Sequence, residues 1–196
     1  MDKAYQTIST AIAHVADCSA VEPHGIAKIM AEMYPSTSPH SLRKRLGHLD
    51  RARLQDRSTP GTIRAWQSND NSPVVVNLFA TFYTGQPIES NESSQRLVTK
   101  LRWAKKYGLE SEMSFDSHFY EGLRQDTIEN RLKFFRDSMR TLWGLIRGPC
   151  SYIRELVIPY SVTDMDKEDW KKHYLPVIRR FAEQVSPKLR VVVLVV

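Results

Sequence analysis

The first polar loop of the chain holds residues whose types and spacing could do chemistry. His14 and Cys18 stand four positions apart, and a histidine that deprotonates a nearby cysteine produces a thiolate nucleophile. A small buried cysteine beside a strand gives the same pattern, and this simpler interpretation is favoured. Further along the loop, Gly25 stands where a helix is expected to begin. Backbone N–H groups at such a position attract phosphate, so the loop predicts either a plain helix start or an anion site.

Two clusters of basic residues suggest a different chemistry, contact with a polyanion. The chain has 28 Lys and Arg against 22 Asp and Glu, a formal net charge of +6, which makes an anionic partner worth testing. One cluster lies between residues 43 and 57. The other surrounds Trp103, and its basic members are Lys100, Arg102, Lys105 and Lys106. Cations interleaved with aromatic rings are typical of single-strand binders, but a solvated helix with Trp103 in the core explains the same pattern.

Apolar patterns predict the elements that must position these loops. Short apolar runs predict strands over residues 8–16, 62–66, 74–79, 153–158 and 189–196. Helical periodicity predicts helices over residues 25–34, 126–147 and 170–184. Asp126 and Glu129 are expected to form an N-terminal capping pair. Pro176 implies either a kink or a helix whose regular part begins there.

The alternation of these elements predicts the fold class. Strands that alternate with helices favour an α/β protein, here a three-layer α/β/α sandwich with a mixed central sheet. The nearly continuous apolar run over 74–79 is typical of a strand buried on both faces. Ligands of such sheets bind beyond the carboxyl ends of the strands, which draws attention to loops 17–25, 80–86 and 159–169. We expect one domain over residues 1–196, with a basic, irregular insertion at about 88–125.

Composition excludes several classes of protein. No apolar run reaches the roughly 20 residues that span a bilayer, and the N-terminus lacks the pattern of a signal peptide. Two cysteines make no disulfide framework, and no zinc-ligand spacing occurs. We therefore expect an intracellular protein, cytoplasmic or nuclear, with no membrane partner, no metal and no cofactor.

Three segments in a fixed order carry a family resemblance. They are IAHVADCSAVEPHGIAKIMAEMYP, then PGTIRAW with SPVVVNLFATFYTGQP, and finally IRELVIPYSVTDMDKEDWKKHYLPVIRRFAEQ. Together with the long helix that carries Arg131, they resemble the macrodomain family, whose members bind ADP-ribose in an α/β/α fold. The resemblance covers most of the chain outside residues 41–58 and 88–125.

The resemblance implies a set of ligand-binding residues. The backbone amides of Gly25, Ile26 and Ala27 would face phosphate, and Asp17 or its neighbouring backbone would line the distal ribose. The remaining expected cleft residues are Phe79, Phe82, Tyr160 and Val162.

The chain also departs from the family at residues that matter for chemistry. The family has a glycine-rich phosphate loop where residues 161–168 contain no glycine, and Asp164, Asp166 and Glu168 place negative charge there. Thr81 stands where glutamine is common, and the usual first strand is not recognisable. Asp166 aligns with the catalytic aspartate of ADP-ribosyl glycohydrolases, but no lysine follows the 74–79 strand. Asp166 is therefore either a catalytic residue or a first-turn acid of the next helix.

Two functions follow as expectations. The first is binding of ADP-ribose or a related nucleotide, free or attached to a protein or nucleic acid, with removal of ADP-ribose as an open enzymatic question. The alternative is a macrodomain-like scaffold that has lost its nucleotide site and binds protein or nucleic acid through its basic surface.

Overall fold

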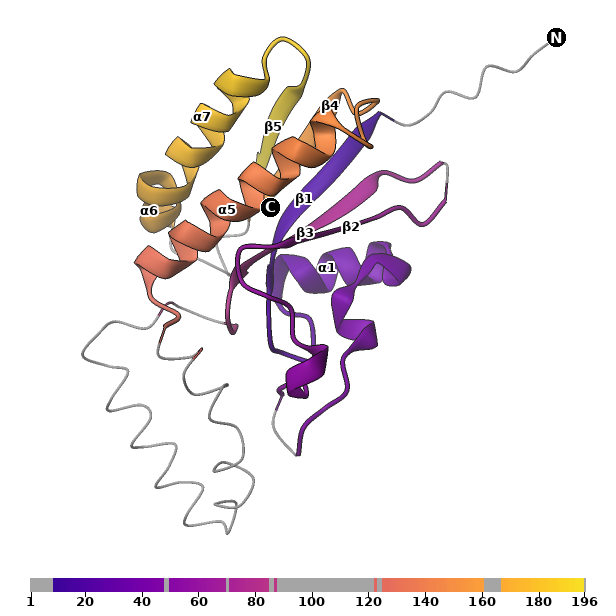
Figure 1. The fold of residues 1–196 in the computed structure, drawn as a ribbon, viewed down its shortest axis with the longest axis vertical. Helices are drawn as coiled ribbons and strands as arrows, with labels where there is room; N and C mark the ends of the chain where they lie inside the picture. Colours follow the sequence, from indigo (N-terminus) through magenta and orange to yellow (C-terminus); the bar gives the residue numbers. More distant parts are fainter. Residues whose placement is uncertain are drawn as a thin grey trace, which may run out of the picture.

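Five strands of the chain form a single sheet. The computed structural model describes residues 9–47, 50–69, 71–84, 87, 122, 125–160 and 167–195. The strands are β1 Thr10–Asp17, β2 Ile63–Trp66, β3 Val74–Thr81, β4 Glu155–Tyr160 and β5 Arg190–Val195. Their order is β2-β3-β1-β4-β5 (Figure 1). β1, β3, β4 and β5 are parallel, whereas β2 is antiparallel to β3. The predicted mixed sheet is confirmed.

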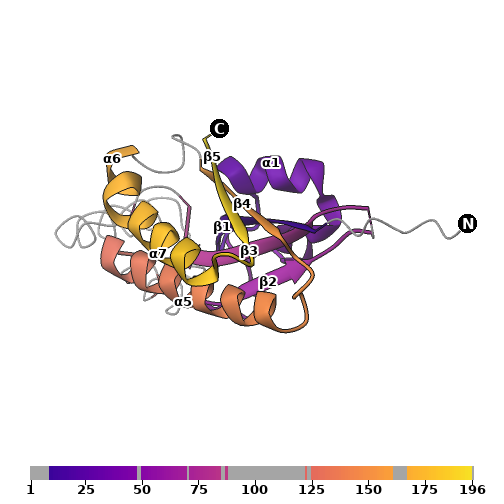
Figure 2. The ribbon, with the colours of Figure 1, turned by 90° about the horizontal axis from the view of Figure 1, so that it is seen from above.

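Helices cover both faces of this sheet. On one face lie α5 (Ile128–Arg147) and α7 (Leu175–Val185), preceded by α6 (Lys167–Asp169), while α1 (Gly25–Met33) lies on the other face (Figure 2). Short 3-10 turns follow α1, at Pro35–Thr37, Pro39–Leu42 and Leu54–Asp56. The three-layer α/β/α sandwich is therefore confirmed.

The main core lies between the sheet and the α5–α7 layer. Buried residues of α5 recur at steps of three and four, as predicted; they are Leu132, Phe135, Met139, Leu142 and Ile146. Two edge-on aromatic pairs join α5 to α7 and to the turn before it. The ring centroids are 5.1 Å apart in Phe135–Tyr174 and 6.3 Å apart in Trp143–Phe181. Each fully buried side chain of this size contributes roughly 1.5–3 kcal/mol.

The two edges of the sheet differ in burial from its centre. Every residue of β3 except Thr81 is buried, which confirms the prediction of a strand covered on both faces. At the far edge β5 is more open, with Leu194 50% and Val195 68% exposed.

No helix in the described ranges is both long and apolar enough to cross a bilayer.

Three local predictions are changed or sharpened. The predicted capping pair is wrong: Thr127 is the N-cap of α5, and its side chain accepts a hydrogen bond from the Asn130 amide. β4 does not end before Pro159 but continues to Tyr160. The regular part of α7 begins at Leu175, after a π-helical segment at Trp170–Tyr174, so the second alternative for Pro176 is the correct one. Apart from residues 122 and 125, the expected insertion at 88–125 lies outside the described residues.

Candidate functional site

The sheet opens at the carboxyl ends of β1 and β4. These two neighbouring strands pair only from Thr10–Glu155 to Ile12–Val157, whereas β1 stays paired with β3 as far as Asp17. The connection from β1 passes through α1 on one face, and the connection from β4 passes through α7 on the other. Such a reversal of direction is a topological switch point, where open α/β sheets bind their ligands. The predicted location of the site therefore has a geometric basis in this fold.

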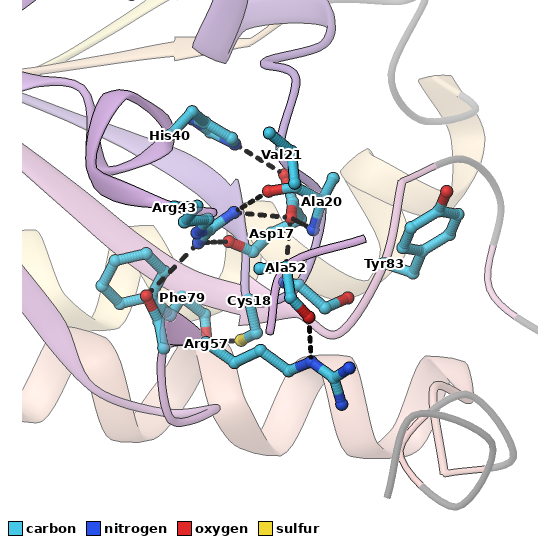
Figure 3. Close-up of polar contacts among 12 residues, drawn as sticks. Asp17, Cys18, Ala20, Val21, His40, Arg43, Ala52, Arg57, Phe79 and Tyr83 are labelled. Atoms are coloured by element: carbon cyan, nitrogen blue, oxygen red, sulfur yellow. Dashed lines mark hydrogen bonds and ion pairs between the residues drawn. The ribbon is translucent and has the colours of Figure 1, made fainter. Parts of the chain in front are cut away.

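Asp17 ends β1 at this opening, but its carboxylate is committed to the protein. Oδ1 accepts from the backbone amides of Ser19 (3.0 Å) and Ala20 (2.6 Å) and from Nη1 of Arg43 (3.0 Å). Oδ2 lies 2.9 Å from Nε2 of His40 (Figure 3). All of these groups are buried. The side chain thus fixes the conformation of the loop after β1, and a ligand would meet that loop's backbone instead of the carboxylate.

Arg43 completes this network, although no sequence pattern predicts that its segment lies there. Its Nη2 donates to the Asp17 carbonyl at 2.7 Å, and its Nη1 donates to the Ala20 carbonyl at 2.5 Å (Figure 3). Arg43 belongs to the basic cluster at 43–57, whose arginines look solvent-exposed in the sequence. The leucines of this segment follow only a weak helical spacing (Leu42, Leu46, Leu49 and Leu54), and the chain forms short 3-10 turns there instead of a helix.

Ser38, His40 and Asp17 stand in the order of a hydrolase triad, since Ser38 Oγ lies 3.4 Å from Nδ1 of His40. In such triads the aspartate stabilises the histidine cation that forms during the reaction. Here Arg43 already neutralises Asp17, which weakens that stabilisation. The arrangement is therefore better suited to holding the loop than to catalysis.

A second buried ion pair lies at the carboxyl end of β3. Asp126 accepts from the backbone amides of Phe82 (2.9 Å) and Tyr83 (3.3 Å), and Arg131 donates to both carboxylate oxygens, at 2.9 and 2.6 Å. Each of the two charged residues is only 1% exposed. This bidentate ion pair holds the start of α5 against the end of β3. Because the Asp126 carboxylate is engaged there, it is not the helix cap.

The N-terminus of α1 lies beside the opening. Gly25 has a φ of 51°, a left-handed conformation that glycine adopts readily. In the loop that precedes Gly25, the backbone amides of Val21 (2.9 Å) and Glu22 (2.8 Å) donate hydrogen bonds to the carboxylate of Asp50. The same carboxylate contacts Nε2 of His24 at 3.0 Å. Partial burial opposes ionisation, but these hydrogen bonds outweigh it and lower the pKa of Asp50. The loop before α1 therefore already binds one carboxylate, which belongs to the protein.

The expected cleft side chains are mostly packed inward. Ile26 and Ala27 are buried on the sheet side of α1. Phe79 and Phe82 are buried in a small cluster, and Gly122 approaches so closely that a Cβ there would lie 2.2 Å from the Phe82 ring. Tyr160 packs on Trp170, with ring centroids 4.4 Å apart. The structure thus brings these residues to one end of the sheet, with their side chains in the core.

The remaining expected site residues lie outside the described residues. They are Val162, Asp166, Lys100, Arg102, Lys105 and Lys106.

The interpretation of Cys18 as a structural residue is confirmed. Its sulfur lies 4.0 Å from the Phe79 carbonyl, and burial raises the pKa of the thiol well above its ordinary value. Burial likewise lowers the pKa of His14 to about 4, although Nδ1 donates to the Val15 carbonyl. The thiol and the imidazole each contact a different backbone carbonyl and both stay neutral, so His14 and Cys18 form no thiolate pair at neutral pH.

Two tyrosines near the opening are also held in their neutral form. Tyr83 donates from its hydroxyl to the Asp50 carbonyl at 3.0 Å, and burial raises its pKa to about 12. Burial raises the pKa of Tyr174 to about 12 as well. Among the described residues, no three metal-ligating side chains gather.

Comparison with solved structures gives only a distant likeness. The chain resembles the macrodomain of Mycobacterium tuberculosis DarG with a TM-score of 0.48 and 10% sequence identity, over 99% of this chain and 93% of that one. The sequence matches no protein-family model and no curated protein. A likeness this distant leaves the function to be argued from the geometry of the site.

Proposed function

We propose that the chain binds ADP-ribose or a chemically related nucleotide at the opening between β1 and β4. The observation that carries this proposal is the divergence of these two strands after Val157, at the switch point of the sheet. It supports a ligand that enters from the carboxyl edge and lies between the loop after β1 and the end of β4. The protein is proposed to act as one domain over residues 1–196, with the segment at about 88–125 as an insertion.

The start of α1 is the part of this opening that suits the phosphates. A helix N-terminus carries partial positive charge, which favours an anion. The left-handed Gly25 turns the chain into the helix, so the amides of residues 25–27 would face the diphosphate. The loop after β1 is held by Asp17 and Arg43, which lowers the entropic cost of ordering it around a ribose.

Calorimetry with ADP-ribose at millimolar concentration tests the proposal. Binding should be measurable in the unchanged chain and lost in Gly25→Glu, because the new carboxylate would stand where phosphate is expected. Gly47→Glu is the matched control, since Gly47 is exposed and shares the left-handed backbone of Gly25, with a φ of 64°. Absence of heat in the unchanged chain, or equal binding in both variants, would contradict the proposal.

One observation favours a second candidate function, that of a macrodomain-like scaffold that has lost its nucleotide-binding site. Asp17 and Asp126, the carboxylates at the ends of β1 and β3, are both satisfied by protein donors. In that case ADP-ribose would leave the melting temperature unchanged. The basic cluster around Trp103 would then bind the partner, and charge reversal at Lys100, Lys105 and Lys106 should abolish a strongly salt-dependent affinity for nucleic acid.

Removal of ADP-ribose from a target is a further step that would depend on Asp166. Turnover of an ADP-ribosylated substrate should disappear in Asp166→Ala if that carboxylate is catalytic. Unchanged turnover would assign Asp166 to the start of the following helix.

A further inference from the structure

A groove lies at the opposite end of the sheet from the proposed nucleotide site. It has a volume of about 710 Å³, and its floor is formed by the buried side chains of Ile146 and Ile153. Three segments form its walls: the last turn of α5, the turns before β4 and the turn before β5. Because β4 and β5 begin here, the groove is at the amino edge of the sheet, and no function discussed above uses it.

The walls of this groove carry three cations, Arg147, Arg154 and Lys188, all exposed. No acidic side chain lines the groove within the described residues, and none of the three cations forms an ion pair there. The neighbouring Glu155 is engaged with Arg190 at 3.2 Å. The groove therefore presents three positive charges that no acidic side chain of the described segments neutralises.

The carboxyl ends of two helices offset part of this positive charge but not all of it. α5 ends at Arg147, and α7 ends three residues before Lys188. The carboxyl end of each helix is equivalent to about half a negative charge, so the two together offset roughly one cation. An excess of about two positive charges remains, which favours an anionic ligand.

The groove is held in shape before any ligand binds. The turns before β4 are fixed by backbone hydrogen bonds, including Cys150 N to Leu145 O (3.0 Å) and Ile153 N to Cys150 O (3.1 Å). Arg154 donates from Nη1 to the Ser151 carbonyl at 2.5 Å and to the Ile153 carbonyl at 3.2 Å. Its Nη2 and Nε donate to no protein group within the described ranges, so they remain for a ligand.

An aromatic ring stands beside the cations. Trp143 contacts Phe181 edge-on on the core side, and the guanidinium of Arg147 lies 5.4 Å from the Trp143 ring centroid. Such an arginine–tryptophan stack offers a planar surface on which a base can stack. Phosphates beside cations and bases on planar groups are the two contacts that proteins make with single-stranded nucleic acid.

We propose that this amino-edge groove binds a single-stranded nucleic acid, with phosphates on Arg147, Arg154 and Lys188 and a base on the Trp143–Arg147 stack. The inference stands apart from the proposed nucleotide site. A duplex would not place an unstacked base in a groove of this size, so the single strand is the favoured form.

The test measures fluorescence anisotropy of a labelled oligothymidylate of about 16 nucleotides, added to the full chain at several salt concentrations. We expect log affinity to fall with log salt with a slope of about −2, from three phosphate contacts on a single strand. The variant R147E/R154E/K188E should bind about tenfold more weakly or worse. R147Q/R154Q/K188Q, which is milder for folding, should show the same direction of change.

The control variant K28E/K133E/K172E changes the net charge equally at exposed positions that do not line the groove, and it should retain most of the affinity. The proposal is overturned if the groove variants and the control lose affinity equally, if a duplex of the same length binds as tightly, or if no binding occurs. ADP-ribose calorimetry on the groove variants should match the unchanged chain, and Gly25→Glu should leave oligonucleotide binding intact. The two sites can therefore fail independently.

Discussion

The two ends of the sheet use charge in opposite ways. At the carboxyl edge, Asp17 and Asp126 are buried and paired with Arg43 and Arg131 through short hydrogen bonds. At the amino edge the cations are exposed and without acidic partners in the described chain. Charges removed from water must be paired to be tolerated, whereas exposed charges remain unpaired at little cost. The first arrangement therefore holds loops in place, and the second is free to meet a ligand.

The largest effect should come from breaking a buried pair. Arg131→Met leaves the Asp126 carboxylate buried without its cation, which should lower the free energy of unfolding by about 3–5 kcal/mol. Urea denaturation measures the change. Arg140→Met is the matched control, because Arg140 forms an exposed ion pair with Asp137 and its loss should cost less than about 1 kcal/mol. Similar small losses in both variants would contradict the assignment of a structural role to the buried pair.

The next effect concerns His14, which is buried and kept neutral. Its pKa is about 4 in the folded chain and ordinary, near 6.5, in the unfolded chain. The unfolded chain therefore binds the proton more readily between these values, and stability falls as the pH drops from about 6.5 toward 4, by on the order of 2–3 kcal/mol. Denaturation at pH 7.5 and pH 4.5 should show this loss.

His14→Gln removes the titrating group, so its free energy of unfolding should fall less over the same pH interval. The carboxylates titrate in both proteins, and the difference between the two profiles isolates the histidine. Parallel profiles would show that His14 is not protected from protonation.

Neutralising the groove should have a smaller effect on stability than breaking the buried pair. R147Q/R154Q/K188Q removes two cations near helix carboxyl ends and the hydrogen bonds from Arg154 to the Ser151 and Ile153 carbonyls, so the free energy of unfolding should fall by about 1–2 kcal/mol. Thermal or urea unfolding is the measurement. A loss comparable to that of Arg131→Met would mean that the amino edge is also structural, and the contrast between the two edges would disappear.

The last prediction concerns the reactivity of the two cysteines and involves no change in stability. Cys18 is buried with a raised thiol pKa, whereas Cys150 is partly exposed. A thiol reagent should therefore label Cys150 promptly in the native chain and reach Cys18 only after unfolding. Cys150→Ser should abolish the prompt phase. Rapid labelling of Cys18 in that variant would show that the carboxyl edge opens readily.

The elements of the fold could be predicted because their signals are local. The apolar run of β3 and the three-and-four spacing of α5 record burial along one stretch of chain, and their alternation leads to the layered sheet. Gly25 could likewise be located as a helix start from the sequence alone.

The site could not be predicted to the same degree because its contacts join distant positions. Asp17 is held by His40 and Arg43, which lie 23 and 26 positions away, where the sequence shows only a weak helical spacing. Nothing in the sequence tells an arginine that neutralises a buried carboxylate from one in solvent. The amino-edge groove could not be predicted from the sequence for the same reason, since its cations come from three separate segments of the chain.

The hydrogen bond from the Tyr83 amide to Asp126 joins positions 43 apart in the chain, so the end of β3 and the start of α5 are held together at this point. The entropy of closing a loop grows only with the logarithm of its length, and lengthening or shortening such a detour costs little once its two ends are clasped. A short linker between the clasped ends should therefore leave the sandwich able to fold.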